Sequence, residues 1–316
     1  MTNTPVIATT ELTKQFDDNI AVNQVNLQVN AGEIYGLIGP NGAGKTTLIR
    51  MLATAEEPTA GHIYICGQRL IQDQPNPEIQ RIIGYLPDDF PLYDDLNVTD
   101  YLDYFARLYH LTAPQLTQRI HEVLELVSLE NKRHSLISTL SRGMKQRLSL
   151  ARTIIYRPTL LILDEPASGL DPIARVQYRE TIKTLQQQGM TIFISSHILS
   201  DLEDFCTSIG IMEAGRLVKS ARLQDLYQRD RSEQRIVIGL LQKTDRLKQF
   251  LQTAPLVTAC EMLPQNKVCI NFSGKTEDAA RLLRSLIDSE FSITEFAPVQ
   301  ERLEDIFLKL GYQQTS

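Results

Sequence analysis

A glycine-rich stretch at residues 39–46 is the clearest candidate for chemistry in this sequence. It reads Gly-Pro-Asn-Gly-Ala-Gly-Lys-Thr and fits the phosphate-binding pattern G-x-x-x-x-G-K-[ST] in full. An apolar run at 34–38 precedes it and a helical pattern follows it, as this pattern requires. Glycines allow backbone N–H groups to turn toward phosphate oxygens, and the start of a helix adds partial positive charge. The stretch therefore predicts a nucleotide-phosphate site.

Three side chains at the end of this loop have separate predicted roles. Lys45 can reach the β- and γ-phosphates, Thr46 can ligate Mg²⁺, and Thr47 can donate to the α-phosphate. The other members of the predicted cradle are Gly39, Pro40, Asn41, Gly42, Ala43 and Gly44. The loop alone is compatible with kinases, GTPases and many ATPases. The guanine-reading N-K-x-D pattern of a GTPase is absent from the sequence.

A second candidate is an apolar run at 160–163 that ends in two acids, Asp164 and Glu165. Carboxylates at the end of a parallel strand face the same crevice as the phosphate loop. We expect Asp164 to bind Mg²⁺ through water. We expect Glu165 to act as the general base that polarises the attacking water. Alone, such a strand end could be a simple charged turn, but beside a phosphate loop the catalytic interpretation is the stronger one.

The elements that would position these residues alternate between strand-like and helix-like blocks, which indicates an α/β fold. Strands are expected at 25–29, 34–38, 160–163 and 191–194, and an antiparallel hairpin at 211–218. From about 88 to 158 the apolar residues fall at helical spacing, which predicts a helical insert whose first helix is capped by Thr99. Together with the phosphate loop, this predicts a P-loop NTPase fold with a RecA-like core, the insert and an antiparallel β region.

The end of the chain reads as a second, smaller unit. A polar stretch near 228–234 predicts a linker between a nucleotide-binding domain at 1–230 and a small α+β domain at 231–316. Beyond the linker, the order strand, helix, strand, strand, helix, strand favours a ferredoxin-like unit. A last amphipathic helix is expected to carry Leu303, Ile306, Phe307 and Leu310.

The composition is that of an ordinary globular protein. Of 316 residues, 42% are hydrophobic and 22% charged, which excludes disordered and fibrous classes. The net charge of −6 disfavours a general nucleic-acid binder. Four scattered cysteines (Cys66, Cys206, Cys260 and Cys269) indicate reduced thiols in a cytosolic protein. The N-terminus lacks a secretory pattern, and no apolar stretch approaches the ~20 residues that a membrane helix needs.

Residues 140–147, just before a predicted helix, read Leu-Ser-Arg-Gly-Met-Lys-Gln-Arg. This stretch resembles the L-S-G-G-Q signature of ABC ATPases, which distinguishes that family from other P-loop proteins. Ser141 and Gly143 match the family pattern, whereas Arg142 and Met144 depart from its commonest form. The resemblance implies ATP as the nucleotide. It also implies that Ser141 and Gly143 hold the γ-phosphate of an ATP bound to the opposite subunit of a dimer.

Further motifs follow in the family's order, and the resemblance covers about residues 6–230. Residues 168–171, ending in Asp171, look like the D-loop, which communicates across the dimer. His197 looks like the switch histidine that touches the γ-phosphate. Phe16 matches the aromatic residue that stacks on adenine, although a core phenylalanine is the alternative.

One position departs from the family pattern in an informative way. The Q-loop glutamine would fall within 85–89, where the best match is Asp88, which can still bind Mg²⁺ or a water. Acidic residues here are similar to those of a subgroup that serves exporters. The tail at 299–307 resembles the ending of subunits paired with type-two exporter permeases. Beyond Asp88, we expect Phe90, Leu92 and Tyr93 either to contact a permease or to pack the insert onto the core.

The leading interpretation is therefore an ATP-hydrolysing ABC transporter subunit that drives export of an unknown substrate. The implied partners are a separate membrane permease and a second ATP-binding subunit, in a homodimer or a heterodimer, and no nucleic acid is expected. The expected location is the cytoplasmic face of the cell membrane, held there through the permease. The alternatives are a soluble ABC ATPase acting on ribosomes or nucleic acid and a regulatory protein with little turnover. Because the chain has one phosphate loop and no sustained heptads, and both Glu165 and His197 are present, the sequence favours the transporter subunit.

Overall fold

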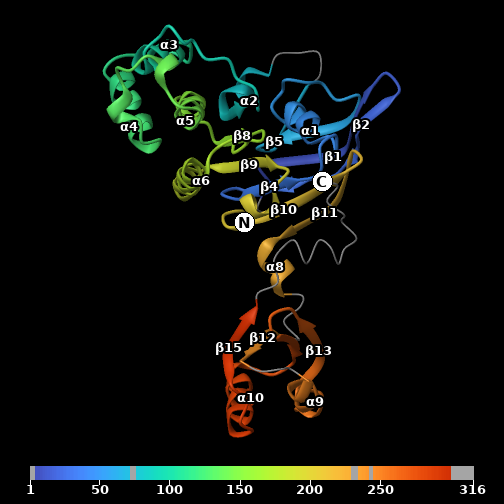
Figure 1. Cartoon of the computed structure of the whole chain (residues 1–316). Coiled ribbons are helices and arrows are strands. Elements are labelled where there is room, and N and C mark those ends of the chain that lie inside the picture. The colour runs from blue at the N-terminus through green and yellow to red at the C-terminus, as the bar shows by residue number, and fades with distance from the viewer. Residues whose placement is uncertain (1–3, 72–75, 229–233, 242–244, 300–316) are drawn as a thin grey trace. The chain divides into compact units, whose positions relative to one another are not determined.

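The computed structural model describes residues 4–71, 76–228, 234–241 and 245–299. The chain folds into two compact units, with the division between Arg222 and Leu223 (Figure 1). The predicted last helix and residues 300–307 of the tail motif lie outside the described residues.

The core of the first unit is a six-stranded, mostly parallel sheet. Its strands are β4 (Ile34–Ile38), β7 (Ile83–Leu86), β8 (Leu160–Leu163), β9 (Thr191–Ser196), β10 (Ser208–Glu213) and β11 (Arg216–Arg222). Their order is β11-β10-β4-β9-β8-β7, and β11 pairs antiparallel to β10 through the predicted hairpin. Every residue of β4, β8 and β9 is buried, as expected for parallel strands with both faces covered. The P-loop NTPase core is confirmed.

A second, antiparallel sheet in this unit forms the predicted β region. It contains β1 (Ile7–Phe16), β2 (Asn19–Val25), β3 (Gln28–Val29), β5 (Ala60–Ile65) and β6 (Gln68–Arg69). The order is β2-β1-β5-β6, with β3 also paired to β1. The strand expected at 25–29 is therefore divided between β2 and β3. Side chains of this sheet, such as Leu12 and Ile63, share one core with Leu48 and Ile162.

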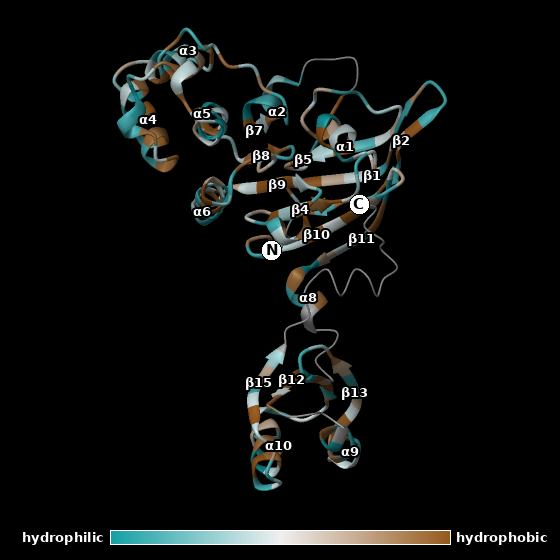
Figure 2. Ribbon diagram, viewed as in Figure 1, coloured by the Kyte–Doolittle hydropathy of each residue, from teal (hydrophilic) through white to brown (hydrophobic). Residues whose placement is uncertain are grey.

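The helices of the first unit include the predicted insert. They are α1 (Lys45–Leu52), α2 (Pro77–Ile82), α3 (Val98–Leu108), α4 (Gln115–Leu126), α5 (Arg142–Ile154), α6 (Pro172–Gln187) and α7 (Leu199–Glu203), with 3-10 turns at Glu130–Lys132 and Ile137–Thr139. Helices α3, α4 and α5 follow β7, as the helical spacing predicted. Figure 2 shows brown and teal segments together along α4, as expected for an amphipathic helix.

The predicted cap of α3 is wrong. Asn97 caps this helix, because its backbone is extended and its side-chain oxygen accepts a hydrogen bond from the Asp100 N–H at 2.8 Å. Thr99 lies inside the first turn, where its hydroxyl donates to the Arg133 carbonyl at 2.8 Å. That partner lies 34 residues away in the sequence, so local spacing could not reveal it.

The second unit has the predicted order of elements. After α8 (Leu223–Gln228) come β12 (Gln234–Leu240), α9 (Asp245–Thr253), β13 (Val257–Leu263), β14 (Lys267–Phe272), α10 (Thr276–Asp288) and β15 (Ile293–Val299). The sheet order is β13-β14-β12-β15, all antiparallel, which is the ferredoxin-like arrangement. Its core is separate from that of the first sheet and includes Ile238, Leu251, Ile270, Phe272 and Leu286.

Candidate active site

The phosphate loop runs from the end of β4 into α1, as the sequence predicted. Its glycines are needed for close packing: a Cβ on Gly39 would lie 2.3 Å from the Met212 carbonyl oxygen, and one on Gly44 would lie 2.1 Å from that of Ala21. Gly42 and Gly44 also have positive φ angles of 80° and 98°, which L-residues rarely adopt. Glycine at 39 and 44 therefore lets the loop pack against the backbone of Met212 and Ala21, and the positive φ angles let it turn into α1 as a phosphate loop requires.

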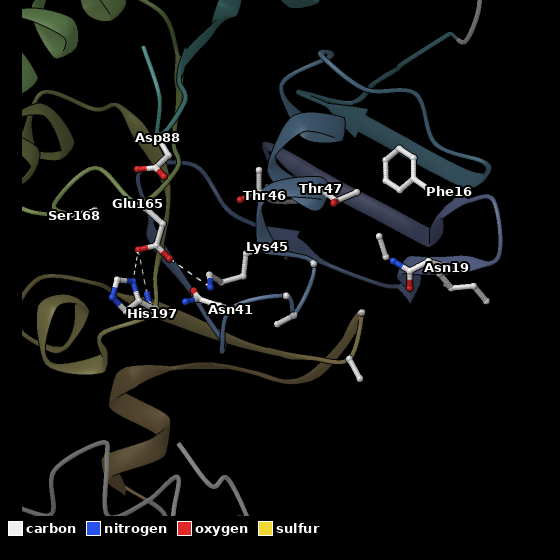
Figure 3. A pocket seen from close by; sticks show the side chains of 17 residues that line it. Phe16, Asn19, Asn41, Lys45, Thr46, Thr47, Asp88, Glu165, Ser168 and His197 are labelled. Carbon is white, nitrogen blue, oxygen red and sulfur yellow. Dashed lines mark hydrogen bonds and ion pairs between the residues drawn. The ribbon is translucent and has the colours of Figure 1, made fainter. Parts of the chain in front are cut away.

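Lys45 lies buried at the start of α1 and is held by the loop itself. Its Nζ donates to the Gly39 carbonyl at 2.7 Å and to the Pro40 carbonyl at 3.3 Å. The same nitrogen lies 3.4 Å from the Glu165 carboxylate (Figure 3). One cation thus joins the loop to the acidic end of β8.

Asp164 is buried at the end of β8, where its Oδ1 accepts a hydrogen bond from the Ser195 hydroxyl at 2.7 Å. Burial raises the pKa of Asp164 above its ordinary value, and hydrogen bonds from Ser195 and Thr46 oppose that rise. Thr46 thus lies beside the carboxylate with which it was predicted to share Mg²⁺. A carboxylate and a hydroxyl are the hard oxygen donors that this ion prefers.

Glu165 follows Asp164 with a positive φ of 46°, a strained conformation for a residue other than glycine. Its N–H donates to the Ser195 hydroxyl at 2.9 Å, which holds the backbone in this conformation. Its Oε2 lies 2.8 Å from Nδ1 of His197 and accepts from the His197 N–H at 3.3 Å (Figure 3). The structure therefore brings Lys45, Glu165 and His197 together. The sequence analysis did not predict Ser195, whose hydroxyl donates to the Asp164 carboxylate and accepts from the Glu165 N–H.

Lys45, Thr46, Glu165 and His197 line a cavity of about 730 Å³, whereas Asp164 and Ser195 lie buried behind it. Its lining consists of Phe16, Asn19, Ile20, Ala21, Asn41, Gly42, Ala43, Gly44, Lys45, Thr46, Thr47, Asp88, Glu165, Ser168, His197, Ala214 and Gly215. Phe16 lies at the end of β1, away from the acidic group, and 43% of its surface is exposed (Figure 3). An exposed ring in a cavity is available for stacking, whereas the alternative of a core phenylalanine requires burial.

Asp88 follows β7 and faces the same cavity (Figure 3). Desolvation raises the pKa of Asp88, and the nearby charges of Asp164, Glu165 and Asp89 raise it further, while Arg142 opposes them. Asp164 and Glu165 are therefore near enough for their charges to act on Asp88, although among the described residues no three acidic, cysteine or histidine side chains are grouped closely enough to hold a metal ion.

The remaining predicted residues lie outside this lining. Ser141 caps α5 and accepts from the Met144 N–H at 3.3 Å, and it is exposed. Gly143 is buried, and a Cβ there would lie 2.9 Å from that of Ala174 on α6. Asp171 caps α6 by accepting from the Ala174 N–H at 2.8 Å. Within one subunit these residues shape helix starts and do not line the cavity.

Comparisons with known proteins agree with this geometry. A family model described as ABC transporter matches residues 22–168. The chain is 34% identical over 300 residues to an uncharacterized ABC transporter ATP-binding protein, YxlF, of Bacillus subtilis (strain 168), covering 95% of this chain and 97% of the relative. It is 33% identical over 306 residues to the bacitracin transport ATP-binding protein BcrA of Bacillus licheniformis, covering 96% and 97%. The Nod factor export ATP-binding protein I of Cupriavidus pinatubonensis (strain JMP 134 / LMG 1197) is 32% identical over 311 residues, covering 97% and 91%.

A solved ATP-binding subunit of an ABC transporter superposes with a TM-score of 0.63 at 32% identity, covering 71% of this chain and 92% of that one. The phosphate loop, the acidic end of β8 and the signature at the start of α5 occur here in the order that the resemblance implied. The chain therefore belongs to the ABC transporter family, as an ATP-binding protein that hydrolyses ATP.

Proposed function

We propose that this chain is the ATPase subunit of an exporter and acts on a separate membrane permease. The observation that carries the proposal is the contact of Glu165 with both Lys45 and His197 beside the phosphate loop, a constellation suited to hydrolysis rather than to regulation by binding alone. The names of the relatives from Bacillus licheniformis and Cupriavidus pinatubonensis, which mention bacitracin transport and Nod factor export, support export. Among the described residues, we find no helix with the length and apolarity to cross a membrane.

In the proposed mechanism the chain's own residues place the reacting groups. Lys45 and the loop N–H groups hold the β- and γ-phosphates, Thr47 donates to the α-phosphate, and Phe16 stacks on adenine. Thr46, Asp164 and Asp88 would hold Mg²⁺, which supplies charge neutralisation at the phosphates when bound. Glu165 polarises the attacking water, and His197 holds the Glu165 carboxylate and touches the γ-phosphate.

We also propose that two subunits meet head to tail, so that Ser141 and Gly143 of one subunit close over the ATP of the other. In support, Ser141 is exposed at a helix start and lies outside its own subunit's cavity lining. Ile173 and Val176, at the start of α6 beside Asp171, are 73% and 51% exposed, which leaves an apolar edge for a second copy. The second subunit is a copy of this chain or a related ATP-binding subunit.

The two predicted domains are assigned different roles in this proposal. Residues 1–230 are the ATP-binding domain, with the insert at about 88–158, and residues 231–316 are an accessory domain. The protein lies at the inner face of the cell membrane, held by the permease. The comparisons with transport proteins disfavour the alternative of an ABC ATPase acting on ribosomes or nucleic acid.

The proposal is tested with Glu165→Gln in inverted membrane vesicles that contain the chain and its co-expressed permease. ATP-driven uptake is measured for bacitracin and a panel of other compounds. We expect the variant to bind ATP while hydrolysis falls roughly 10²–10⁴-fold, the usual contribution of a general base, and uptake to fall with it. Hydrolysis near the wild-type rate would remove Glu165 from the mechanism. A wild-type ATPase that drives uptake of no tested compound, and that co-purifies with no membrane protein, would contradict the exporter assignment.

A further inference from the structure

Arg142 departs from the signature pattern of the family, and the structure shows where its side chain goes. It is the first residue of α5, directly after the cap Ser141, and it is exposed. Its Nη2 donates to the Ser168 carbonyl at 3.1 Å. Because Ser168 lies 26 residues further along the chain, this contact joins the start of α5 to the turn that follows β8.

Gly169, the residue after Ser168, lies directly against the Arg142 guanidinium. Gly169 has a φ of 66°, and a Cβ there would lie 2.4 Å from Cζ of Arg142 and 2.5 Å from both terminal nitrogens. Any side chain at Gly169 would therefore displace the guanidinium from its seat. Glycine at 169 thus leaves the space that the guanidinium occupies.

The turn that Arg142 holds begins at Glu165. The Ser168 N–H donates to the Glu165 carbonyl at 3.0 Å, which closes the turn from 165 to 168. At the start of this turn, the Glu165 N–H donates a hydrogen bond to the Ser195 hydroxyl. Since the φ of Glu165 is strained, its conformation needs support from both sides. Ser195 gives that support from β9, and Arg142 gives it from α5.

We propose that Arg142 is a positioning residue for hydrolysis. It holds the 165–168 turn of its own subunit and thereby orients the Glu165 carboxylate. Arg142 is absent from the lining of the 730 Å³ cavity and contacts the turn instead, so we assign it a positioning role and no contact with the ATP of its own subunit. The inference deepens the proposed hydrolytic mechanism and is independent of what the protein exports. It assigns to one arginine a link between the signature helix and the general base.

Lys145 provides a matched control one turn along the same helix. Arg142 and Lys145 both line a smaller cavity of about 300 Å³, together with Asp88, Asp94 and Glu165. The Lys145 ammonium is paired with the Asp94 carboxylate at 2.8 Å, and within the described part of the chain it forms no hydrogen bond or ion pair with the 165–168 turn. Removing either cation changes the charge of the same cavity, whereas the loss of Arg142 also removes the hydrogen bond to the turn and a positive charge that acts on Asp88.

The first experiment compares kcat and KM for Mg·ATP in Arg142→Ala, Arg142→Lys and Lys145→Ala, each checked for an unchanged melting temperature. We expect Arg142→Ala to lower kcat about tenfold, the effect of losing one hydrogen bond from a charged donor, while KM changes less than about twofold. Arg142→Lys should recover part of the loss, and Lys145→Ala should keep the wild-type kcat. An unchanged kcat in Arg142→Ala, or an equal loss in Lys145→Ala, would overturn the proposal.

Mixed dimers test whether Arg142 acts within its own subunit. One dimer pairs a wild-type subunit with an Arg142→Ala/Glu165→Gln subunit, and the other pairs Arg142→Ala with Glu165→Gln. In the first, the only active Glu165 has its own Arg142, so we expect the rate of a wild-type/Glu165→Gln dimer. In the second, that Glu165 lacks its arginine, so the rate should fall about tenfold further. The reverse order of rates, or equal loss in both, would refute positioning within the subunit. If the subunits form no dimer, the dimer proposal fails, and the kinetics of the single variants decide the role of Arg142.

Discussion

At the scale of single residues, the acidic group in the cavity carries an electrostatic cost in the nucleotide-free protein. Desolvation raises the pKa of Asp88, and the nearby charges of Asp164 and Glu165 raise it further. A carboxyl group whose pKa is higher in the folded state stabilises the fold when protonated, and this contribution is lost as pH rises through the folded pKa. A divalent cation bound beside these carboxylates would offset this repulsion.

The raised pKa of Asp88 leads to a prediction for the Asp88→Asn variant. The variant keeps the shape of the side chain and removes its charge, so we expect nucleotide-free Asp88→Asn to melt at a higher temperature than the wild type. The difference should be small near pH 4 and should grow as pH rises toward 7, because only the wild type ionises. Differential scanning fluorimetry across this range measures it, with the exposed Asp95→Asn as control. A lower melting temperature at pH 7 would show that the Asp88 carboxylate stabilises the empty site.

The sequence predicted the site residues where one local pattern contains both the chemistry and its context. Lys45 and Thr46 lie in a loop of fixed spacing, and Asp164 and Glu165 end an apolar strand, so each could be assigned from its neighbours in the chain. Ser195 could not be assigned, because its role comes from hydrogen bonds to residues 30 and 31 positions away. A serine at the end of a buried strand has no sequence signal until the order of β8 and β9 is known.

At the scale of elements, α6 and α7 are tied together by ion pairs that link two motifs of the site. Helix α6 begins just after Asp171, and α7 begins just after His197. Nη1 of Arg175 lies 3.1 Å from the Asp201 carboxylate, and its Nη2 donates to the Leu170 carbonyl at 3.5 Å. Arg175 thus joins the loop before α6 to the helix that follows the loop carrying His197.

A double-mutant cycle with Arg175→Gln and Asp201→Asn tests this link. We expect each single variant to lower the free energy of unfolding and the double variant to lower it by less than their sum. The coupling should be about 0.5–1 kcal/mol, since the pair is partly exposed. Urea denaturation supplies the free energies. Additive effects would show that the two side chains do not interact in solution.

The helical insert carries a cluster of aromatic residues, two of which are about half exposed. Tyr93 contacts three rings of α3, with centroids 6.0 Å from Tyr101, 6.1 Å from Tyr104 and 6.2 Å from Phe105. Tyr93 and Tyr104 nevertheless remain 49% and 47% exposed. The ring of Tyr93 therefore packs on α3 within the insert and is also partly exposed, and its predicted contact with a permease stays a prediction.

We expect Tyr93→Ala to weaken co-purification with the permease at least tenfold while the isolated subunit keeps most of its ATPase rate. The reason is that an exposed aromatic residue at an interface often contributes 2 kcal/mol or more, on the order of a thirtyfold change in affinity. Val218→Ala, which truncates an exposed apolar residue on β11, is the control. If association persists while the melting temperature and basal rate fall, packing within the insert is the main role of Tyr93.

The order of elements was predicted better than their ends. Runs such as 160–163 and the strand pair 257–263 and 267–272 have the predicted bounds, because a turn or a charge closes them on both sides. The strand at 191–194 continues to Ser196, because Ser195 and Ser196 pair with β4 despite their polar side chains. Polar residues that serve the site thus lengthen a strand beyond its apolar run.

At the scale of the whole molecule, each of the two units has a hydrophobic core of its own among the described residues. The first is built on the sheets of the ATP-binding unit and includes Phe193, whose ring stacks on Tyr35 at 5.3 Å. The second belongs to the ferredoxin-like unit and includes Phe272, which is 1% exposed. The family motifs of the sequence lie almost entirely in the first unit, so its function could be predicted and that of the second could not.

Because each unit has its own core, we expect the two units to unfold in separate transitions. We expect Phe272→Ala to destabilise the ferredoxin-like unit by about 3–5 kcal/mol, the usual cost of removing a buried phenylalanine. Differential scanning calorimetry should then show one transition shifted to lower temperature and one unchanged. The ATPase rate at temperatures below the shifted transition should stay at the wild-type value, because every residue of the proposed mechanism lies in the other unit. Phe193→Ala is the complementary variant and should shift the other transition and abolish hydrolysis. A single transition that moves in both variants, or an ATPase rate that falls with the melting of the second unit, would show that the two cores unfold as one and that the second unit supports the active site.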